Sequence, residues 1–191
     1  MIRCLITALV ATLFSPLASA TEAADLFMDN LRLICGQAFA GQLVEYNDSD
    51  ADLLGEEMVM HVRECPEDEI RIPFFVGEDR SRTWVFTRTA DGLRLKHDHR
   101  HEDGSEDEIT QYGGDSTGGS ATEQSFPADA WTRELIPYAA KNTWTVVIHP
   151  GKTFSYRLVR AGTDRRFRVD FDLSTPVKQP PPPWGAKVEN E

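Results

Sequence analysis

The chain has 191 residues and a formal net charge of −11 at pH 7, from 31 acidic and 20 basic side chains. A protein this acidic repels phosphate backbones, and no basic stripe with interleaved aromatic residues offsets the charge, so nucleic acid is not expected as a partner. The length is typical of a single domain with a sizeable core.

The first twenty residues are typical of a signal peptide. Arg3 supplies a basic start, residues 4–14 form an apolar run, and Ala18-Ser19-Ala20 is a small-residue cleavage site. The apolar run is shorter than the roughly 20 residues of a membrane span, no later stretch is as apolar, and Cys4 is not placed as a lipoprotein acceptor. We therefore expect cleavage after residue 20 and a soluble mature protein in the periplasm or outside the cell, without a transmembrane segment.

Two cysteines, Cys35 and Cys65, remain after removal of this segment. In an oxidising compartment an isolated pair predicts a disulfide, and closing a loop of about 30 residues would stabilise the fold by roughly 3.5 kcal/mol. The alternative is a reduced cysteine that acts as a nucleophile with a histidine base, but the sequence carries no local signature for it.

The mature chain begins with helical periodicity and then changes to short strands. Over residues 21–34, Phe27, Leu31 and Ile34 fall on one helical face, and Gly36 is a stop signal. Farther along, Asp91-Gly92 and Pro150-Gly151 are hairpin signals, and residues 113–119 are expected to form a flexible loop. Strands are predicted near 38–46, 57–64, 69–76, 82–88, 93–101, 108–112, 120–126, 143–149, 153–160 and 165–173, with a short helix near 128–140.

About ten short strands joined mainly by tight hairpins predict a mainly β fold, an antiparallel meander. Closing the meander into a barrel removes its exposed edges, so we expect one β-barrel domain over residues 21–174. Residues 175–191 form a proline-rich tail with a polyproline stretch at 180–183 before Trp184. This tail is expected to lie as a strap across the barrel, although it could instead dock another domain.

Residues 95–108 read LKHDHRHEDGSEDE and contain the clearest candidate for metal chemistry. Side chains alternate along a strand, so one face would carry Leu93, Leu95, His97, His99 and His101. Because that face begins apolar, it is expected to point into the barrel, with the histidines near the mouth. Imidazole nitrogens suit divalent transition metals, and a carboxylate can complete such a site. The predicted metal ligands are His97, His99, His101 and Glu106.

Two alternatives stand beside this metal site. The segment could be only a hydrated hairpin end, with the opposite face, Arg94 to Glu102 at alternate positions, exposed to solvent. The spacing His99-x-His101, four residues, Glu106, then six residues to Gly113 is similar to part of the first cupin motif. However, Gly92 is one residue out of register and the second cupin motif is absent, so a metal-dependent, cupin-like enzyme is the alternative hypothesis.

A second candidate site lies in the segment RIPFFVGEDRSRTWVFTR. Arg82, Trp84, Phe86 and Arg88 would share one strand face, and arginines that flank an aromatic stripe can bind an anionic ligand inside a barrel. The same arginines could instead form salt bridges between neighbouring hairpins, to Glu78, Asp79, Asp98 or Glu102.

Three segments, LRLICGQAFAGQLV, VRECPEDEIRIPFFVGEDRSRTW and GLRLKHDHRHEDGSEDEITQYGGD, resemble a group of uncharacterised secreted proteins of Gram-negative bacteria. The resemblance covers roughly residues 31–176 and implies export but no activity. The strand count is also similar to that of calycin-like barrels such as lipocalins and fatty-acid-binding proteins, although the lipocalin G-x-W motif is missing near Gly41.

The sequence thus leads to three hypotheses. The first is an exported β-barrel that binds a small-molecule ligand or a transition metal at a histidine-lined mouth. The second is a metal-dependent enzyme that uses the same histidines. The third is a cell-envelope interaction protein without a ligand. The sequence gives no indication of the oligomeric state.

Overall fold

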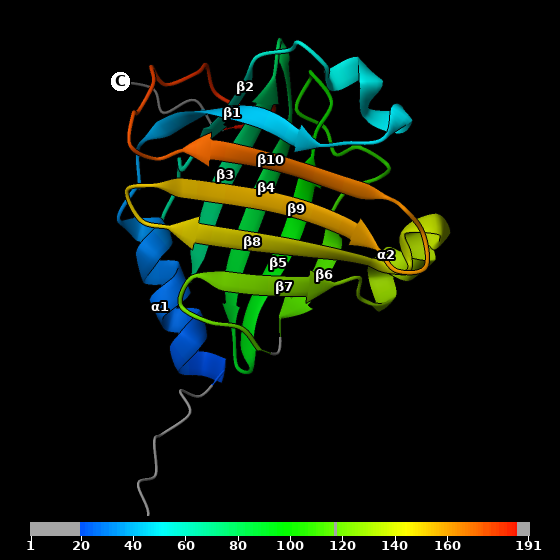
Figure 1. Ribbon diagram of the computed structural model, residues 1–191, viewed down its shortest axis with the longest axis horizontal. Helices are drawn as coiled ribbons and strands as arrows, with labels where there is room; N and C mark the ends of the chain where they lie inside the picture. The colour runs from blue at the N-terminus through cyan, green and yellow to red at the C-terminus, as the bar shows by residue number, and fades with distance from the viewer. Residues whose placement is uncertain (1–19, 117, 187–191) are drawn as a thin grey trace, which may run out of the picture.

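A computed structural model describes residues 20–116 and 118–186 of the chain (Figure 1). Ten antiparallel strands dominate it, accompanied by short helical segments. In chain order the elements are α1 (Ala20–Arg32), β1 (Ala38–Glu45), η1 (Asp48–Leu53), β2 (Met58–His61), β3 (Glu69–Val76), β4 (Asp79–Thr89), β5 (Gly92–His99), β6 (Tyr112–Ser116), β7 (Glu123–Pro127), α2 (Ala130–Leu135), η2 (Pro137–Ala139), β8 (Asn142–His149), β9 (Thr153–Arg160) and β10 (Arg166–Asp172).

The strands form a nearly closed barrel in which consecutive strands pair with each other, except β6 and β7. The order in the sheet is β6-β5-β4-β3-β2-β1-β10-β9-β8-β7, so β1 pairs with β10 and the seam lies between β6 and β7. This architecture is compatible with a calycin-like fold, and it confirms the predicted mainly β class with an N-terminal-region helix and a second short helix.

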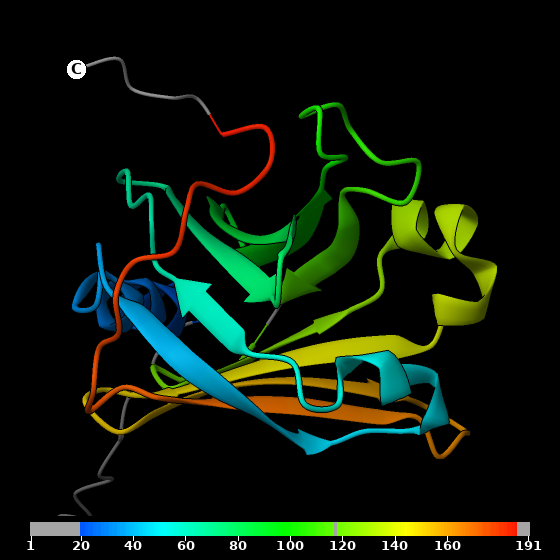
Figure 2. The same ribbon diagram turned by 90° about the horizontal axis from the view of Figure 1, so that it is seen from above.

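Alternation along the strands creates the interior. In β4, Trp84 and Phe86 are buried inside, and they lie opposite His97 and Leu95 of β5 in the sheet register. Helix α1 packs its buried face, which includes Phe27 and Leu31, against the strands at one end of the barrel. The segments η1, α2 and η2 lie at the opposite end (Figure 2).

The seam between β6 and β7 is held by side chains and close backbone contacts. Thr132 of α2 accepts a hydrogen bond from the Gly113 N–H (2.7 Å) and donates one to the Gly113 carbonyl (2.8 Å). Ser116 Oγ donates to Gln124 Oε1 across the seam (2.6 Å). A side chain on Gly114 would collide with the Pro127 carbonyl, so glycine permits this close approach.

The predicted strand at 108–112 and the predicted flexible loop at 113–119 are wrong, because β6 covers Tyr112–Ser116. Two glycines that are typical of loops here serve strand packing, since a side chain on Gly113 would meet the Leu95 carbonyl. The predicted helix at 128–140 is divided into α2 and η2 at Pro137, which cannot continue a helix. The other strands differ from their expected bounds by at most three residues at either end.

The predicted disulfide is confirmed: Cys35 and Cys65 are bonded across a sequence separation of 30. It ties the chain just after α1 to the loop between β2 and β3. The predicted signal peptide lies outside the described residues except for Ala20, the first residue of α1. No helix of the described ranges is long and apolar enough to cross a membrane.

The described part of the C-terminal segment, residues 175–186, runs along the outside of the barrel (Figure 2). The Val177 N–H donates to the Ala38 carbonyl (2.8 Å), and Val177 packs against an outer apolar cluster of Ala38, Val59 and Phe75. Farther along, the Gln179 side chain donates to the Gly36 carbonyl (2.6 Å). The backbone N–H of Trp184 donates to the Arg80 carbonyl (3.1 Å). The segment is therefore attached to the barrel at several points.

Candidate functional site

A cavity of about 470 Å³ lies inside the barrel, lined at its mouth by residues of η1 and η2 at the end opposite α1. Strands β3 to β6 form one wall, β8 to β10 form the other, and η1 and η2 stand at the mouth. Most of its lining side chains are aromatic, histidine or arginine: Phe74, Arg82, Trp84, His97, His99, Tyr112, Tyr138, Trp144, Tyr156, Arg160, Arg165 and Phe167.

Stacked aromatic rings form the apolar wall of the cavity. The Trp84 ring lies between Phe74 and Tyr156, with centroid distances of 4.9 and 4.5 Å and interplanar angles of 13° and 15°. Tyr112 stacks on His97 at 4.4 Å and lies near Trp144 at 5.7 Å. Aromatic rings that line a cavity offer apolar surface to a ligand.

His97 is held by a hydrogen bond at each ring nitrogen. Its Nδ1 is 3.0 Å from the Tyr112 carbonyl and its Nε2 is 2.6 Å from the Tyr156 hydroxyl. Because a carbonyl only accepts, Nδ1 carries the proton, and Tyr156 donates to Nε2. Burial lowers the pKa of His97 to about 3, so the ring is neutral at physiological pH.

His99 and Tyr112 form a second neutral pair nearer the mouth. The Tyr112 hydroxyl is 3.2 Å from His99 Nε2. Burial lowers the pKa of His99 to about 4, with the positive charge of Arg82 as the next cause, and burial raises the pKa of Tyr112 above its usual value. Burial likewise raises the pKa of Tyr156. These two histidine–tyrosine pairs therefore offer hydrogen-bonding groups that carry no charge at pH 7.

The charged lining groups are three arginines and two aspartates. Arg165 is tied to Asp50 of η1 by two hydrogen bonds, one of 2.7 Å between Nη2 and Oδ1. Arg160 donates from Nε to Asn142 Oδ1 (2.9 Å) and lies over the Tyr138 ring, 5.3 Å from its centroid. Since a guanidinium has five N–H donors, Arg160 retains donor capacity beyond this single bond.

The structure brings together some of the sequence-predicted ligand residues and separates others. Arg82 and Trp84 line the cavity. Phe86 is fully buried in the core nearer α1, where its ring lies 6.2 Å from Phe27. Arg88 pairs with Asp25 of α1 and with Asp68 at the same end. Arg82 contacts Asp79, one of the carboxylates of the salt-bridge alternative, at 2.5 Å, whereas the two partners of Arg88 are not among those carboxylates.

The four predicted metal ligands are not assembled into one site. His97 and His99 line the cavity, but both ring nitrogens of His97 are already hydrogen-bonded. Strand β5 ends at His99, so His101 lies in an exposed turn, 3.9 Å from Asp107. Glu106 pairs with Arg100 on the outer face. Across residues 20–116 and 118–186, no group of three or more His, Cys, Asp or Glu side chains could hold a metal ion.

The opposite face of β5 also differs from expectation. Asp98 was expected in solvent but is only 4% exposed, because Arg71 and Arg100 cover it with hydrogen bonds of 2.5 and 2.8 Å. The other two histidines lie away from the cavity. His61 is buried on the outer side of the barrel and His149 is exposed beside a hairpin turn.

Several cavity residues were not anticipated from the sequence, notably Tyr112, Trp144, Tyr156, Arg160 and Arg165. Alternation in TWTVVIH and TFSYRLV could have placed Trp144 and Tyr156 on inward faces. No local pattern, however, marks which inward residues meet an open space rather than a packed core.

No protein-family model matches the chain, and neither do curated proteins or solved structures. The function must therefore be inferred from the site itself.

Proposed function

We propose that this protein is an exported binding protein that holds a small, flat organic anion in the interior cavity. The volume of about 470 Å³ lies within the range of roughly 300–1,000 Å³ that is typical of small-molecule sites. The disulfide between Cys35 and Cys65 is compatible with an oxidising compartment such as the periplasm or the exterior.

The arrangement of rings supports a flat apolar body for the ligand. Trp84 stacks with Phe74 and Tyr156, and Tyr112 and Trp144 also line the cavity. The neutral His97–Tyr156 and His99–Tyr112 pairs add hydrogen-bonding groups that cost little to desolvate compared with charges.

The arginines support an anionic group on the ligand. Asp50 neutralises Arg165 within the site, whereas Arg160 has a neutral amide partner, Asn142. Arg82 pairs with Asp79, but both side chains are about one-third exposed, so solvent screens this ion pair. The single observation that carries the proposal is this combination of an aromatic cavity with guanidinium groups at its mouth.

The test uses two probes that differ by one charged group. The anionic dye 8-anilinonaphthalene-1-sulfonate has a flat apolar body and a sulfonate, and N-phenyl-1-naphthylamine is the same body without the sulfonate. We expect one sulfonated dye to bind per chain, more tightly than the neutral analogue. Replacement of both Arg82 and Arg160 by Gln should remove this difference, measured by fluorescence titration.

A pair of surface substitutions separates the cavity from other apolar patches. Ile109→Trp places a bulky ring at the cavity lining, whereas Val159→Trp alters an exposed residue of β9 outside the lining. Ile109→Trp should weaken dye binding at least about tenfold, equivalent to about 1.4 kcal/mol, and Val159→Trp should not. Equal dye binding by both variants, or none by the wild type, would refute the proposal.

A further inference from the structure

A second cavity, of about 660 Å³, lies on the outer face of the barrel between β2–β5 and the C-terminal segment. Its walls include Thr83 of β4 and Asp98 of β5, which alternate with the inward-facing Trp84 and His97. The sheet itself therefore separates this outer cavity from the interior one. The remaining wall is made by residues 179 and 183–186 of the C-terminal segment.

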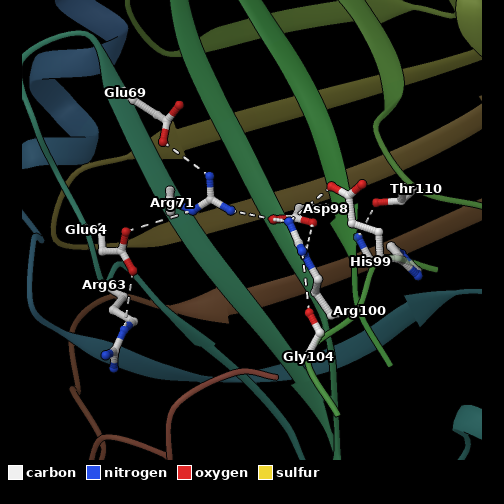
Figure 3. A network of polar contacts seen from close by, with 10 residues as sticks. Arg63, Glu64, Glu69, Arg71, Asp98, His99, Arg100, Gly104 and Thr110 are labelled. Carbon is white, nitrogen blue, oxygen red and sulfur yellow. Dashed lines mark hydrogen bonds and ion pairs between the residues drawn. The ribbon is translucent and has the colours of Figure 1, made fainter. Parts of the chain in front are cut away.

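The floor of the outer cavity is a ladder of paired charges (Figure 3). Arg71 contacts Asp98 at 2.5 Å, Glu69 at 3.3 Å and Glu64 at 3.9 Å. Arg100 donates from Nε to the other Asp98 oxygen at 2.8 Å, and Arg63 lies 3.5 Å from Glu64. Three guanidiniums thus face three carboxylates. The charges of the lining balance, so the cavity has no net charge that would attract an anion or a cation.

Two ring nitrogens in the lining have no hydrogen-bond partner within the described part of the chain. They are Nδ1 of His61, a residue only 5% exposed, and Nε1 of Trp184, and both atoms are buried. Burial, and then the charge of Arg63, lowers the pKa of His61, so a neutral ring is favoured. Buried N–H groups are rarely left unpaired in folded proteins, because an unmade bond is costly. The indole N–H can only donate, so its missing partner is an acceptor.

We propose that the outer cavity is a binding site for a neutral polyhydroxylated ligand, a mono- or disaccharide. Sugar hydroxyls both donate and accept, so they can use the spare carboxylate lone pairs of these paired charges, and movement of the Trp184 side chain on binding would let them accept from its buried indole N–H. They do so without breaking the charge balance of the floor. Pro183 and Trp184 supply the apolar ring surface against which the C–H face of a sugar packs.

The test is saturation-transfer difference NMR on the full mature protein with named sugars. The panel consists of glucose, galactose, N-acetylglucosamine, maltose, cellobiose and di-N-acetylchitobiose, with inorganic phosphate as a separate arm. We expect transfer to at least one sugar and a shift of the Trp184 indole N–H resonance on its addition. Absence of transfer to every sugar of the panel would overturn the proposal. So would a Trp184 shift caused by phosphate alone, since that marks an anion site.

Matched tryptophan variants locate the binding. Trp184→Phe keeps a ring but removes the N–H, and it should weaken sugar binding by about tenfold. Trp184→Ala should abolish the transfer. Trp131→Ala, at an exposed position of α2 outside the lining, should leave it unchanged. Sugar binding that survives Trp184→Ala would overturn the proposed site. Trp184 lies in the irregular C-terminal segment outside the barrel, so we expect these variants to leave the barrel core intact.

Discussion

Strand β4 carries Phe86 toward the end of the barrel that α1 covers and Trp84 into the interior cavity. Strand β5 likewise passes from Leu93 and Leu95 to His97 and His99. At the α1 end the interior side chains of these strands, Phe86, Leu93 and Leu95, are apolar and fully buried. At the cavity end the rings carry nitrogen and oxygen atoms that bond one another around an open space. The same two strands thus provide stability at one end and a chemically varied cavity at the other.

The strongest test of this contrast removes a buried ring at the α1 end. Phe27→Ala should lower the free energy of unfolding by about 3–5 kcal/mol, because it leaves a cavity in a packed core. Ile109→Ala at the cavity end should change it by no more than about 0.5 kcal/mol, since that side chain is partly exposed. Urea unfolding followed by circular dichroism measures both values. Similar losses for the two variants would contradict the division between the ends.

The disulfide belongs to the stabilising end, since it follows α1 directly. The double variant Cys35→Ser/Cys65→Ser should lose roughly 3.5 kcal/mol of unfolding free energy, as expected for a loop of 30 residues. Dye binding by the folded variant should remain as in the wild type, because neither cysteine lines the interior cavity. A changed dye affinity in the folded variant would show that the two ends are coupled.

The cavity end should make stability depend on pH. In the unfolded chain histidine takes up a proton below about pH 6.5, whereas folded His97 and His99 remain neutral down to about 3 and 4. The unfolded state then binds more protons, so unfolding free energy should fall as pH falls from 6.5 toward 4, by up to about 1.4 kcal/mol per pH unit for each histidine. His97→Gln should reduce this slope in urea titrations across that range, and His149→Gln, at an exposed turn, should not. An unchanged slope in His97→Gln would argue against a buried neutral ring.

The smallest expected effect concerns the hydroxyl that pairs with His97. Tyr156→Phe leaves the buried Nε2 without its donor and should cost about 1 kcal/mol of unfolding free energy. Tyr138 is 68% exposed, so Tyr138→Phe serves as the control and should leave the unfolding free energy unchanged. If thermal unfolding shows no loss for Tyr156→Phe, this hydroxyl is free to serve a ligand without a structural role.

The fold was accessible from the sequence because hairpin signals and alternation are local. Asp91-Gly92 fixed the β4–β5 hairpin, and alternation correctly placed Leu95, His97 and His99 on one inward face. Strand β6 was missed because Gly113-Gly114 is typical of a loop. Here the two glycines allow close approach to the backbone of β5 and to Pro127, a requirement set by tertiary packing.

Only part of the candidate site could be predicted from the sequence, for a related reason. Alternation tells which face a residue occupies but not how far along the barrel axis the interior stops being packed. Arg88 therefore looked equivalent to Arg82, although it pairs with Asp25 of α1 at the other end. The histidine run suggested one site, but the strand ended before His101, and Glu106 paired with Arg100 instead. Such partners come from distant parts of the chain and leave no local pattern.

Thr132 gives the barrel an unusual closure. Its hydroxyl bonds both the N–H and the carbonyl of Gly113, and the Asp129 backbone N–H also donates to that carbonyl, so the start of α2 takes the place of a neighbouring strand there. At that position β6 has no backbone groups left to recruit a strand from another molecule, which protects the protein against edge-to-edge association. The same helix leads directly into η2, whose Tyr138 and Ala139 line the interior cavity. The Gly113 carbonyl also accepts a hydrogen bond from the Asp129 backbone N–H (2.9 Å), so loss of the Thr132 hydroxyl would leave the Gly113 N–H as the edge group without its partner.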